Sequence, residues 1–267
     1  MDSPEKIMLW PETVPFSEDG DGFKPYMESF LLKTPTAAGA IIVLPGGGYG
    51  TKMISYEGRD VCARLNEAGF HSFMLEYRVA PNKHPAPLVD AAEAVRTVRG
   101  NAAKWKINPD KIAVLGFSAG GHLAASICVH HELAESLFPN RENKVSARPD
   151  AGILCYPVLS SGKFRHRGSF ENLIGENPSD ELAEKMSLEL NVHKNVPPVF
   201  LWHTANDDCV PVENSLLFAE ALSSHKVPFE LHVYPDGPHG MGLGGSNPHV
   251  ATWINLCTEW LKKMDFQ

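Results

Sequence analysis

The amino-acid sequence predicts a doubly wound α/β fold, in which helices cover both faces of a mostly parallel sheet. Short apolar runs alternate along the chain with longer amphipathic runs, an order typical of strands joined by crossover helices. The short runs are apolar throughout, as in strands that are buried on both faces of a parallel sheet. With 267 residues, 43% of them hydrophobic, the chain is long enough to form a large core.

The predicted elements follow one another in a regular order. The N-terminal stretch contains two segments suited to edge strands, residues 6–10 and 26–32. From residue 39 onward each strand leads through a right-handed crossover to the next, and Gly69 ends the first helix. Strands are expected over residues 39–45, 70–78, 111–117, 150–159, 197–205 and 229–235, and helices over 58–69, 88–105, 120–131, 212–225 and 249–264.

Residues 160–196 interrupt this alternation with a segment of mixed charge. Within it, "ENPSD" is a helix start and "ELAEKMSLEL" is the expected continuation. We expect a small cap-like insertion over the carboxyl edge of the sheet, where ligands bind in such folds; a surface excursion is the alternative. The chain shows no repeat or low-complexity tract, so residues 1–267 are predicted to form a single domain.

The charge of the chain excludes some partners. A net charge of −8 and an isoelectric point of about 5.8 argue against nucleic acid and against an anionic membrane, because both select clustered Lys and Arg. The basic stretch "KFRHRG" at residues 163–168 is too short to change this. The sequence does not indicate an oligomeric state.

The cysteines and the N-terminus indicate a cytoplasmic protein. The five cysteines are odd in number, widely spaced and mostly within apolar runs, so reduced core thiols are predicted rather than disulfides. No basic region followed by an apolar one opens the chain, and nowhere do about 18 apolar residues follow one another. The alternative is a chain from which a signal peptide has been removed.

One serine stands where a predicted strand meets a predicted helix. Ser118 is the centre of G-x-S-x-G at residues 116–120, and this strand–turn–helix context is what a nucleophile elbow requires. Small flanking residues permit the close approach of neighbouring backbone in so tight a turn. The turn lifts the hydroxyl above the sheet edge and aims the amide of Ala119 at the same spot, beside a helix N-terminus of positive potential.

A serine hydroxyl is a good nucleophile only when a base takes its proton and an acid orients that base. The sequence "NDDCVP" places Asp207 and Asp208 after one strand, and "PDGPHGMG" places His239 after the last strand. The carboxyl ends of parallel strands meet at one edge of the sheet, so we expect these residues near Ser118. Their order along the chain agrees with a known order of such triads. Placement alone does not decide which of the two aspartates orients the base.

A glycine-rich loop follows the strand over residues 39–45. In "LPGGGYG", the backbone N–H groups of Gly47 and Gly48 can approach a substrate without side-chain interference. Together with the amide of Ala119 they form the predicted oxyanion hole, although a plain glycine turn is the alternative. Tyr49, beside these glycines, is a candidate substrate-binding residue.

These residues resemble the α/β-hydrolase superfamily, and within it the acetyl-esterase and hormone-sensitive-lipase-like branch. The resemblance runs from about Gly39 to Met264. "PGGGYG" is similar to the HGGG oxyanion motif of that branch, with Pro45 in the histidine position. "EYRVAPNKHPAPLVDAAEAV", "NPDKIAVLGFSAGGHLAA", "DDCVPVENS" and "PHG" resemble its other motifs. In the branch the acid precedes V-P by three residues, which implies Asp207 rather than Asp208.

The resemblance implies a serine esterase that cleaves short-chain esters, acetyl esters above all, through an acyl-enzyme intermediate. In this interpretation Ser118 is the nucleophile, His239 the base and Asp207 the residue that orients it, and no cofactor is required. The polar insertion favours small-molecule esters of sugars or oligosaccharides. The alternatives are a prolyl-oligopeptidase-type peptidase, for whose extra domain the sequence has no room, and a non-catalytic receptor, which would normally have lost a triad residue.

Neither a metal nor a dinucleotide is indicated by the remaining motifs. "HELAE" at residues 131–135 lacks the final histidine of H-E-x-x-H, and no Cys/His cluster has zinc spacing. "GMGLGG" at residues 240–245 matches G-x-G-x-x-G, but no second strand follows to complete a βαβ unit. We interpret it as a flexible loop that carries His239.

Several polar residues have a structural and a functional interpretation. His122 and His203 are predicted to be packed, hydrogen-bonded histidines rather than second bases, and Arg78 a structural ion-pair partner. In the insertion, three polar side chains are candidates for substrate contacts, with ordinary surface positions as the alternative: His166, Arg167 and Ser169.

Overall fold

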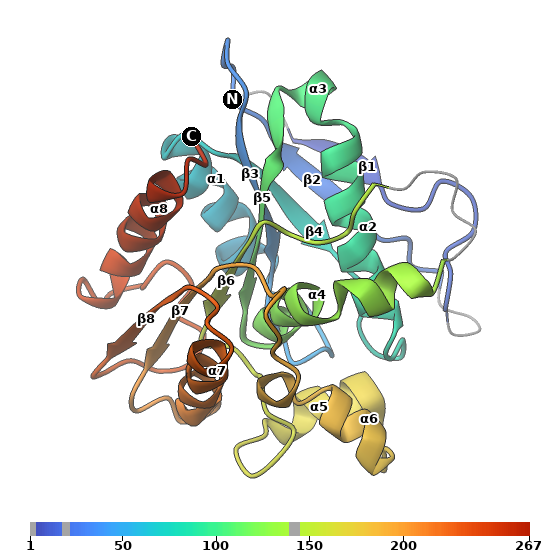
Figure 1. The fold of residues 1–267 in the computed structure, drawn as a ribbon, viewed down its shortest axis with the longest axis vertical. Helices are drawn as coiled ribbons and strands as arrows, with labels where there is room; N and C mark the ends of the chain where they lie inside the picture. Colours follow the sequence, from blue (N-terminus) through green and yellow to red (C-terminus); the bar gives the residue numbers. More distant parts are fainter. Residues whose placement is uncertain (1–3, 18–21, 139–144) are drawn as a thin grey trace.

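The computed structural model describes residues 4–17, 22–138 and 145–267, whose strands form one eight-stranded sheet (Figure 1). The strand order is β1-β2-β4-β3-β5-β6-β7-β8, and the six strands from β4 to β8 in this order are parallel. β1 and β2 pair antiparallel at one edge. The predicted doubly wound, mostly parallel sheet is therefore confirmed. The strands are β1 Glu5–Met8, β2 Tyr26–Phe30, β3 Ala38–Leu44, β4 His71–Glu76, β5 Ile107–Phe117, β6 Ala151–Cys155, β7 Val199–Thr204 and β8 Phe229–Tyr234.

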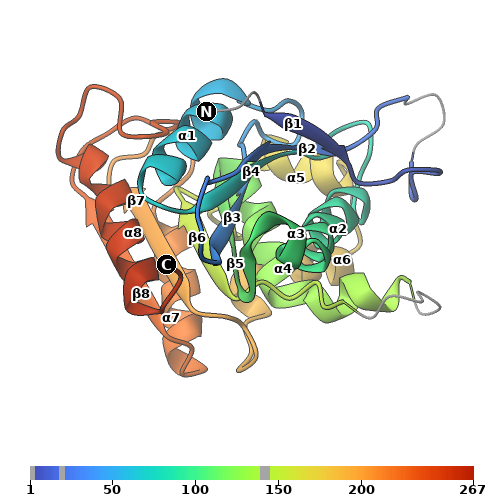
Figure 2. The same cartoon turned by 90° about the horizontal axis from the view of Figure 1, so that it is seen from above.

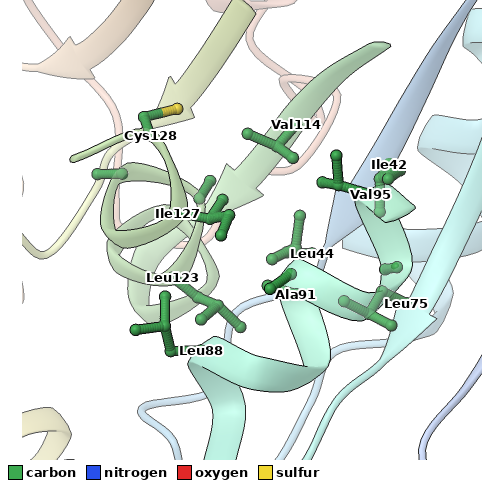
Figure 3. Close-up of a cluster of buried hydrophobic side chains, with 14 of the residues drawn as sticks. Ile42, Leu44, Leu75, Leu88, Ala91, Val95, Val114, Leu123, Ile127 and Cys128 are labelled. Atoms are coloured by element: carbon green, nitrogen blue, oxygen red, sulfur yellow. The ribbon is translucent and has the colours of Figure 1, made fainter. Parts of the chain in front are cut away.

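Helices cover both faces of the sheet, as Figures 1 and 2 show. Successive residues of a strand point to opposite faces, so the wholly apolar β3 contributes to two cores. Ile42 and Leu44 pack with α2 and α4 (Figure 3), whereas Ile41 and Val43 belong to the cluster that contains α1 and α8. The helices on the two faces are α1 Asp60–Glu67, α2 Ala86–Gly100, α4 Ser118–Ser136, α7 Glu213–Ser224 and α8 Trp253–Lys263.

The long helix expected over residues 88–105 is divided in two. α2 ends at Gly100, and a short helix, α3, occupies Ala102–Trp105. Asn101 between them leaves helical geometry with φ −101° and ψ 11°, and its side-chain amide donates to the carbonyl of Thr97 at 2.8 Å. Asparagine and glycine are poor helix formers because the first bonds to nearby backbone and the second loses more backbone entropy.

The insertion contains two short helices, which lie beyond the carboxyl ends of the strands (Figure 1). Ser179 caps the second of them, accepting a hydrogen bond from the amide of Leu182 at 3.2 Å, so the predicted helix start is confirmed. In the first helix, Asn172 donates to the carbonyl of Gly48 at 2.8 Å, which fastens the insertion to the glycine-rich loop. These helices are α5 Arg167–Ile174 and α6 Asp180–Lys185, followed by a 3₁₀ turn at Leu188–Leu190.

The buried polar groups and thiols have mainly structural roles. Arg78 is 1% exposed and pairs with the carboxylate of Asp90 through Nε at 2.8 Å and Nη2 at 2.7 Å, as predicted for an ion-pair partner. The thiols of Cys62, Cys128, Cys155 and Cys257 are free and buried, whereas Cys209 is exposed and is not the core residue that its neighbours suggested. Within the described ranges, no helix has the length and apolar character needed to cross a bilayer.

Candidate active site

Ser118 lies in the predicted sharp turn between β5 and α4. It is the first residue of α4, and its φ of +52° is in the left-handed region, which is strained for a residue with a side chain. A β-carbon at Gly116 would lie 2.0 Å from the carbonyl oxygen of Gly120, and one at Gly120 would lie 2.2 Å from that of Leu44. Both glycines are therefore required by the close approach of backbone around the serine.

The structure brings Ser118, His239 and Asp207 into one chain of hydrogen bonds. The Ser118 Oγ lies 2.8 Å from Nε2 of His239, and Nδ1 of His239 lies 2.7 Å from Oδ2 of Asp207. Asp207 follows β7 and His239 follows β8, so both come from the carboxyl edge of the sheet. Asp208, the other aspartate that placement left open, is exposed to solvent.

The carboxylate of Asp207 is held by more than His239. Its Oδ1 accepts hydrogen bonds from the amides of Cys209 at 2.9 Å and Val210 at 2.8 Å. Burial alone would raise the pKa of Asp207, but hydrogen bonds from His203, His239 and the Val210 amide outweigh it and hold the pKa well below its usual range. Asp207 is therefore an ionised, fixed acceptor for the imidazole.

His203 is the packed histidine that the sequence predicts, with an additional contact. It is fully buried, with Nδ1 2.8 Å from Oγ of Ser215 and Nε2 2.9 Å from the carbonyl oxygen of Val210. A carbonyl only accepts, so Nε2 carries the proton and Nδ1 accepts from the hydroxyl. The same Nε2 lies 3.4 Å from Oδ2 of Asp207, a contact that the sequence did not indicate.

The glycine-rich loop presents unpaired amides next to the serine. The N–H groups of Gly47 and Gly48 have no acceptor among the described residues. Ala119 lies in the first turn of α4, where backbone N–H groups have no partner within the helix. The loop lies against the serine, since a β-carbon at Gly46 would stand 3.0 Å from Cβ of Ser118. The amides predicted for an oxyanion hole thus lie beside the nucleophile candidate.

Residues that sequence reasoning missed hold this loop in place. The carboxylate of Glu57 accepts from the amide of Gly46 at 2.8 Å, and the hydroxyl of Tyr77 donates to the carbonyl of Pro45 at 2.6 Å. Glu57 lies in a π-helical turn, Ser55–Arg59, just before α1. Such turns are frequent at functional sites, but no motif marks Glu57 in the sequence.

Glu57 also connects the glycine-rich loop with the loop that carries His239. Its Oε1 accepts from the hydroxyl of Tyr156 at 2.6 Å, and that hydroxyl accepts from the amide of Gly242 at 2.8 Å. The ring of Tyr156 packs on His239 with 4.9 Å between ring centroids. Burial raises the pKa of Glu57, although hydrogen bonds from Tyr156 and Gly46 oppose this. One buried carboxylate therefore supports two loops of the site.

The expectation that Tyr49 contacts substrate is wrong for this structure. Its side chain is 1% exposed, and its hydroxyl lies 2.9 Å from Nδ1 of His122 in the interior. His122 is also fully buried, with Nε2 2.9 Å from the carbonyl oxygen of Met186, and is the packed histidine that was predicted. The apolar ring of Tyr49 fills core volume and its hydroxyl finds a partner there, which leaves nothing for a ligand.

The three polar candidates of the insertion differ in their surroundings. Arg167 is exposed and pairs with Glu171, while Ser169 is buried and bonds to Nδ1 of His166 at 2.8 Å. Burial and then the neighbouring His239 lower the pKa of His166. His166 is thus the candidate of the three that lies within electrostatic range of the triad residues.

The motifs that partly match metal or dinucleotide sites lie in structural contexts that differ from those of such sites. Within residues 4–17, 22–138 and 145–267, no three His, Cys, Asp or Glu side chains come together as metal ligands. The glycines at residues 240–245 lie in the loop that follows His239, as predicted, and a 3₁₀ turn and α8 come after it. All four of these glycines have positive φ: Gly240, Gly242, Gly244 and Gly245.

Comparison with known proteins places the chain among esterases. The BD-FAE family model matches residues 32–222. The chain is 38% identical, over 87% of its length, to endo-1,4-beta-xylanase B of Butyrivibrio fibrisolvens, and 31% identical, over 94%, to acetylxylan esterase of Xylanibacter ruminicola. It spans 37% of the first relative and 50% of the second.

Solved structures match over nearly the whole chain. The acetyl ester-xyloside bifunctional hydrolase from Caldicellulosiruptor lactoaceticus is 44% identical with a TM-score of 0.93, and the match covers 98% of this chain and 97% of that one. The propionate-bound esterase Est2 of Thermogutta terrifontis is 26% identical with a TM-score of 0.80, and the match covers 99% and 96% of the two chains.

Proposed function

Because the chain belongs to the BD-FAE family of α/β-hydrolase esterases, we propose that it hydrolyses short-chain carboxylic esters, acetyl esters of sugars in particular. The observation that carries the proposal is the continuous hydrogen-bonded chain from Ser118 through His239 to Asp207. The serine of this chain lies beside unpaired loop amides, which is the arrangement that acyl transfer needs.

In the proposed mechanism, Ser118 attacks the ester carbonyl while His239 removes its proton. The tetrahedral intermediate collapses when His239 gives that proton to the leaving alcohol, and an acyl-enzyme remains. Water then attacks the acyl-enzyme, again with His239 as base, and releases the acid and the free serine. Asp207 holds the imidazole in the tautomer that accepts at Nε2.

The negative charge of the intermediate is assigned to the amides of Gly47, Gly48 and Ala119. The loop is already held before substrate arrives, since the carbonyls of Gly47 and Gly48 accept from Thr51 and Asn172, and this limits the reorganisation needed to stabilise the oxyanion. Glu57 supports this role indirectly, since its bond to the Gly46 amide holds the residue that precedes Gly47 and Gly48.

The acyl and alcohol parts of the proposal are supported by different observations. Relatives named as an acetylxylan esterase and an acetyl ester-xyloside hydrolase support acetyl groups on xylose-type sugars. The apolar residues of α5, Phe170, Leu173 and Ile174, are 9% exposed or less, so they offer little surface to a fatty chain.

A fluorophosphonate probe tests the proposal directly, because it forms a covalent bond only with an activated serine. We expect it to label Ser118 and to leave the Ser118→Ala protein unlabelled. A wild-type protein without label would support the non-catalytic receptor instead. Cleavage of prolyl peptide amides in preference to acetyl esters would support the peptidase.

The pH dependence of kcat/KM is expected to show one rising limb, because the general base of this mechanism accepts a proton only in its unprotonated form. Asp207 adds no second limb near neutral pH, because its lowered pKa keeps it ionised there. Initial rates on a small acetyl ester, with chemistry limiting, measure the profile.

Glu57 and His166 both interact electrostatically with His239, and variants of these two residues provide the controls for this profile. Burial raises the pKa of Glu57 and lowers that of His166. The limb should persist in Glu57→Gln and in His166→Asn, because neither variant removes the base. A flat profile in the wild-type protein would rule out a histidine base.

Among acyl chains, kcat/KM should fall from acetyl to butyryl to octanoyl esters of one alcohol. The physical reason is that the buried α5 side chains leave little apolar surface to cover added methylene groups. Steady-state kinetics on the three esters measures this order. Preference for the octanoyl ester would contradict the proposal for acetyl groups.

A further inference from the structure

A cavity of about 650 Å³ lies beside His239, on the side of the π-helical turn. Its walls are Tyr56 and Asp60 on one side and the loop of residues 238–247 on the other. Its size is in the range of small-molecule sites, and it shares His239 with the proposed triad.

The chemistry of ester cleavage requires the alcohol to lie next to His239. The imidazole delivers its proton to the leaving oxygen, so that oxygen must lie within hydrogen-bond distance of Nε2. The carbonyl oxygen faces the amides of the glycine-rich loop. The rest of the alcohol therefore extends past His239, where the cavity offers space.

Tyr56 presents an aromatic face to this cavity. It is 41% exposed, and its ring lies against the glycine loop: a β-carbon at Gly242 would stand 3.0 Å from Cδ2 of Tyr56, and one at Gly240 would stand 3.6 Å from its hydroxyl. A side chain at Gly242 would crowd the ring, whereas one at Gly240 would be in ordinary contact with the hydroxyl. Gly242 thus allows this aromatic wall to lie against the loop that carries His239.

Two polar groups of the cavity are free to bind. Neither the hydroxyl of Tyr56 nor the carboxylate of Asp60 has a hydrogen-bond or ion-pair partner in the part of the chain that the structure describes. An ionised carboxylate only accepts hydrogen bonds, so it suits a neutral alcohol with several hydroxyl groups and repels an acidic one.

We propose that this cavity binds the sugar of the ester, with a pyranose ring against Tyr56 and its hydroxyl groups donating to Asp60. The inference rests on the proposed esterase function and assigns it a sugar-binding subsite. It places sugar recognition on the π-helical turn and the His239 loop rather than on the insertion, whose α5 is fastened to the glycine-rich loop through Asn172.

The test compares two esters of acetic acid, an acetylated xylobiose and ethyl acetate, whose alcohol is too small to reach the aromatic wall. The measured quantity is the ratio of kcat/KM for the first ester to that for the second. We expect Tyr56→Ala to lower this ratio about tenfold or more, because it removes the ring face and a hydroxyl. Tyr56→Phe, which retains the ring, should lower it less.

Asp60 is tested with the charge of the sugar. Asp60→Asn should lower the ratio for the neutral xylobiose ester and raise the relative rate on an acetylated glucuronic acid, since it removes a repulsive charge. Unchanged rates on both sugars would show that Asp60 does not face the bound alcohol.

Control variants separate this subsite from other locations. Leu190→Ala changes a side chain that is 67% exposed in the insertion and should leave the ratio unchanged. A ratio that falls in Arg167→Ala but not in Tyr56→Ala would place the sugar on the insertion and overturn the inference. If the wild-type protein hydrolyses both esters and no variant changes the ratio, the subsite is overturned but the proposed esterase function is not. A wild-type protein that cleaves neither ester and takes no fluorophosphonate overturns the proposed function, and the subsite with it.

Discussion

Replacing Ser118 with alanine is expected to lower kcat for acetyl ester hydrolysis by about 10⁴-fold to 10⁶-fold, without loss of the fold. The variant removes only the hydroxyl that bonds to His239 at 2.8 Å. The turn retains both glycines that its backbone requires, and alanine replaces serine with almost the same volume. Steady-state rates on ethyl acetate and a thermal unfolding curve measure the two parts of this prediction.

The control for Ser118→Ala is the same substitution at Ser223, an exposed residue of α7. Ser223→Ala should retain wild-type rates, because the side chain of Ser223 has no proposed role in the reaction. Full activity in the Ser118→Ala protein would end the proposal of a serine nucleophile. Loss of activity together with loss of the cooperative unfolding transition would show that Ser118 acts through stability.

The second large effect is expected from the acid. Asp207→Asn should reduce kcat by about 10⁴-fold, since an amide in this position favours the wrong tautomer of His239 and cannot stabilise its charged form. The reason is geometric: Oδ2 of Asp207 lies 2.7 Å from Nδ1 of His239, and Oδ1 is already occupied by two backbone amides.

Asp208→Asn is the matched control, because it makes the same change at the adjacent, exposed position. We expect it to alter kcat less than about twofold, because the exposed side chain of Asp208, unlike that of Asp207, does not bond to His239. Equal losses in the two variants, or a larger loss in Asp208→Asn, would assign the acid to Asp208. Circular dichroism of both proteins checks that neither substitution disturbs the sheet.

The sequence by itself determined the elements whose causes are local. The alternation of apolar runs specified the sheet, and G-x-S-x-G specified the turn at Ser118, because the glycines at 116 and 120 are the condition for that backbone path. The order of strands along the chain also placed Asp207 and His239 at the correct edge, since parallel strands end on the same side. Between the two aspartates, the spacing implied by the family favoured Asp207, the one that bonds to His239.

Where the sequence prediction was wrong, the contacts of individual side chains were the cause. Tyr49 follows the glycines of the loop, as a substrate contact would, but its side chain is buried against His122. The break between α2 and α3 depends on the side chain of Asn101, which a pattern of apolar residues does not register. The spacing of apolar residues does not specify such contacts, so periodicity alone could not distinguish these cases.

Only the tertiary structure decided which residues support the site. Glu57 bonds to Tyr156 across 99 positions of the chain, and Asn172 bonds to Gly48 across 124. Such partners leave no local pattern, since any acceptor on the right element would satisfy the same donor. Local backbone requirements determine which residues are adjacent in the sequence. Hydrogen bonds between distant segments, in contrast, exist only once the sheet has brought those segments together.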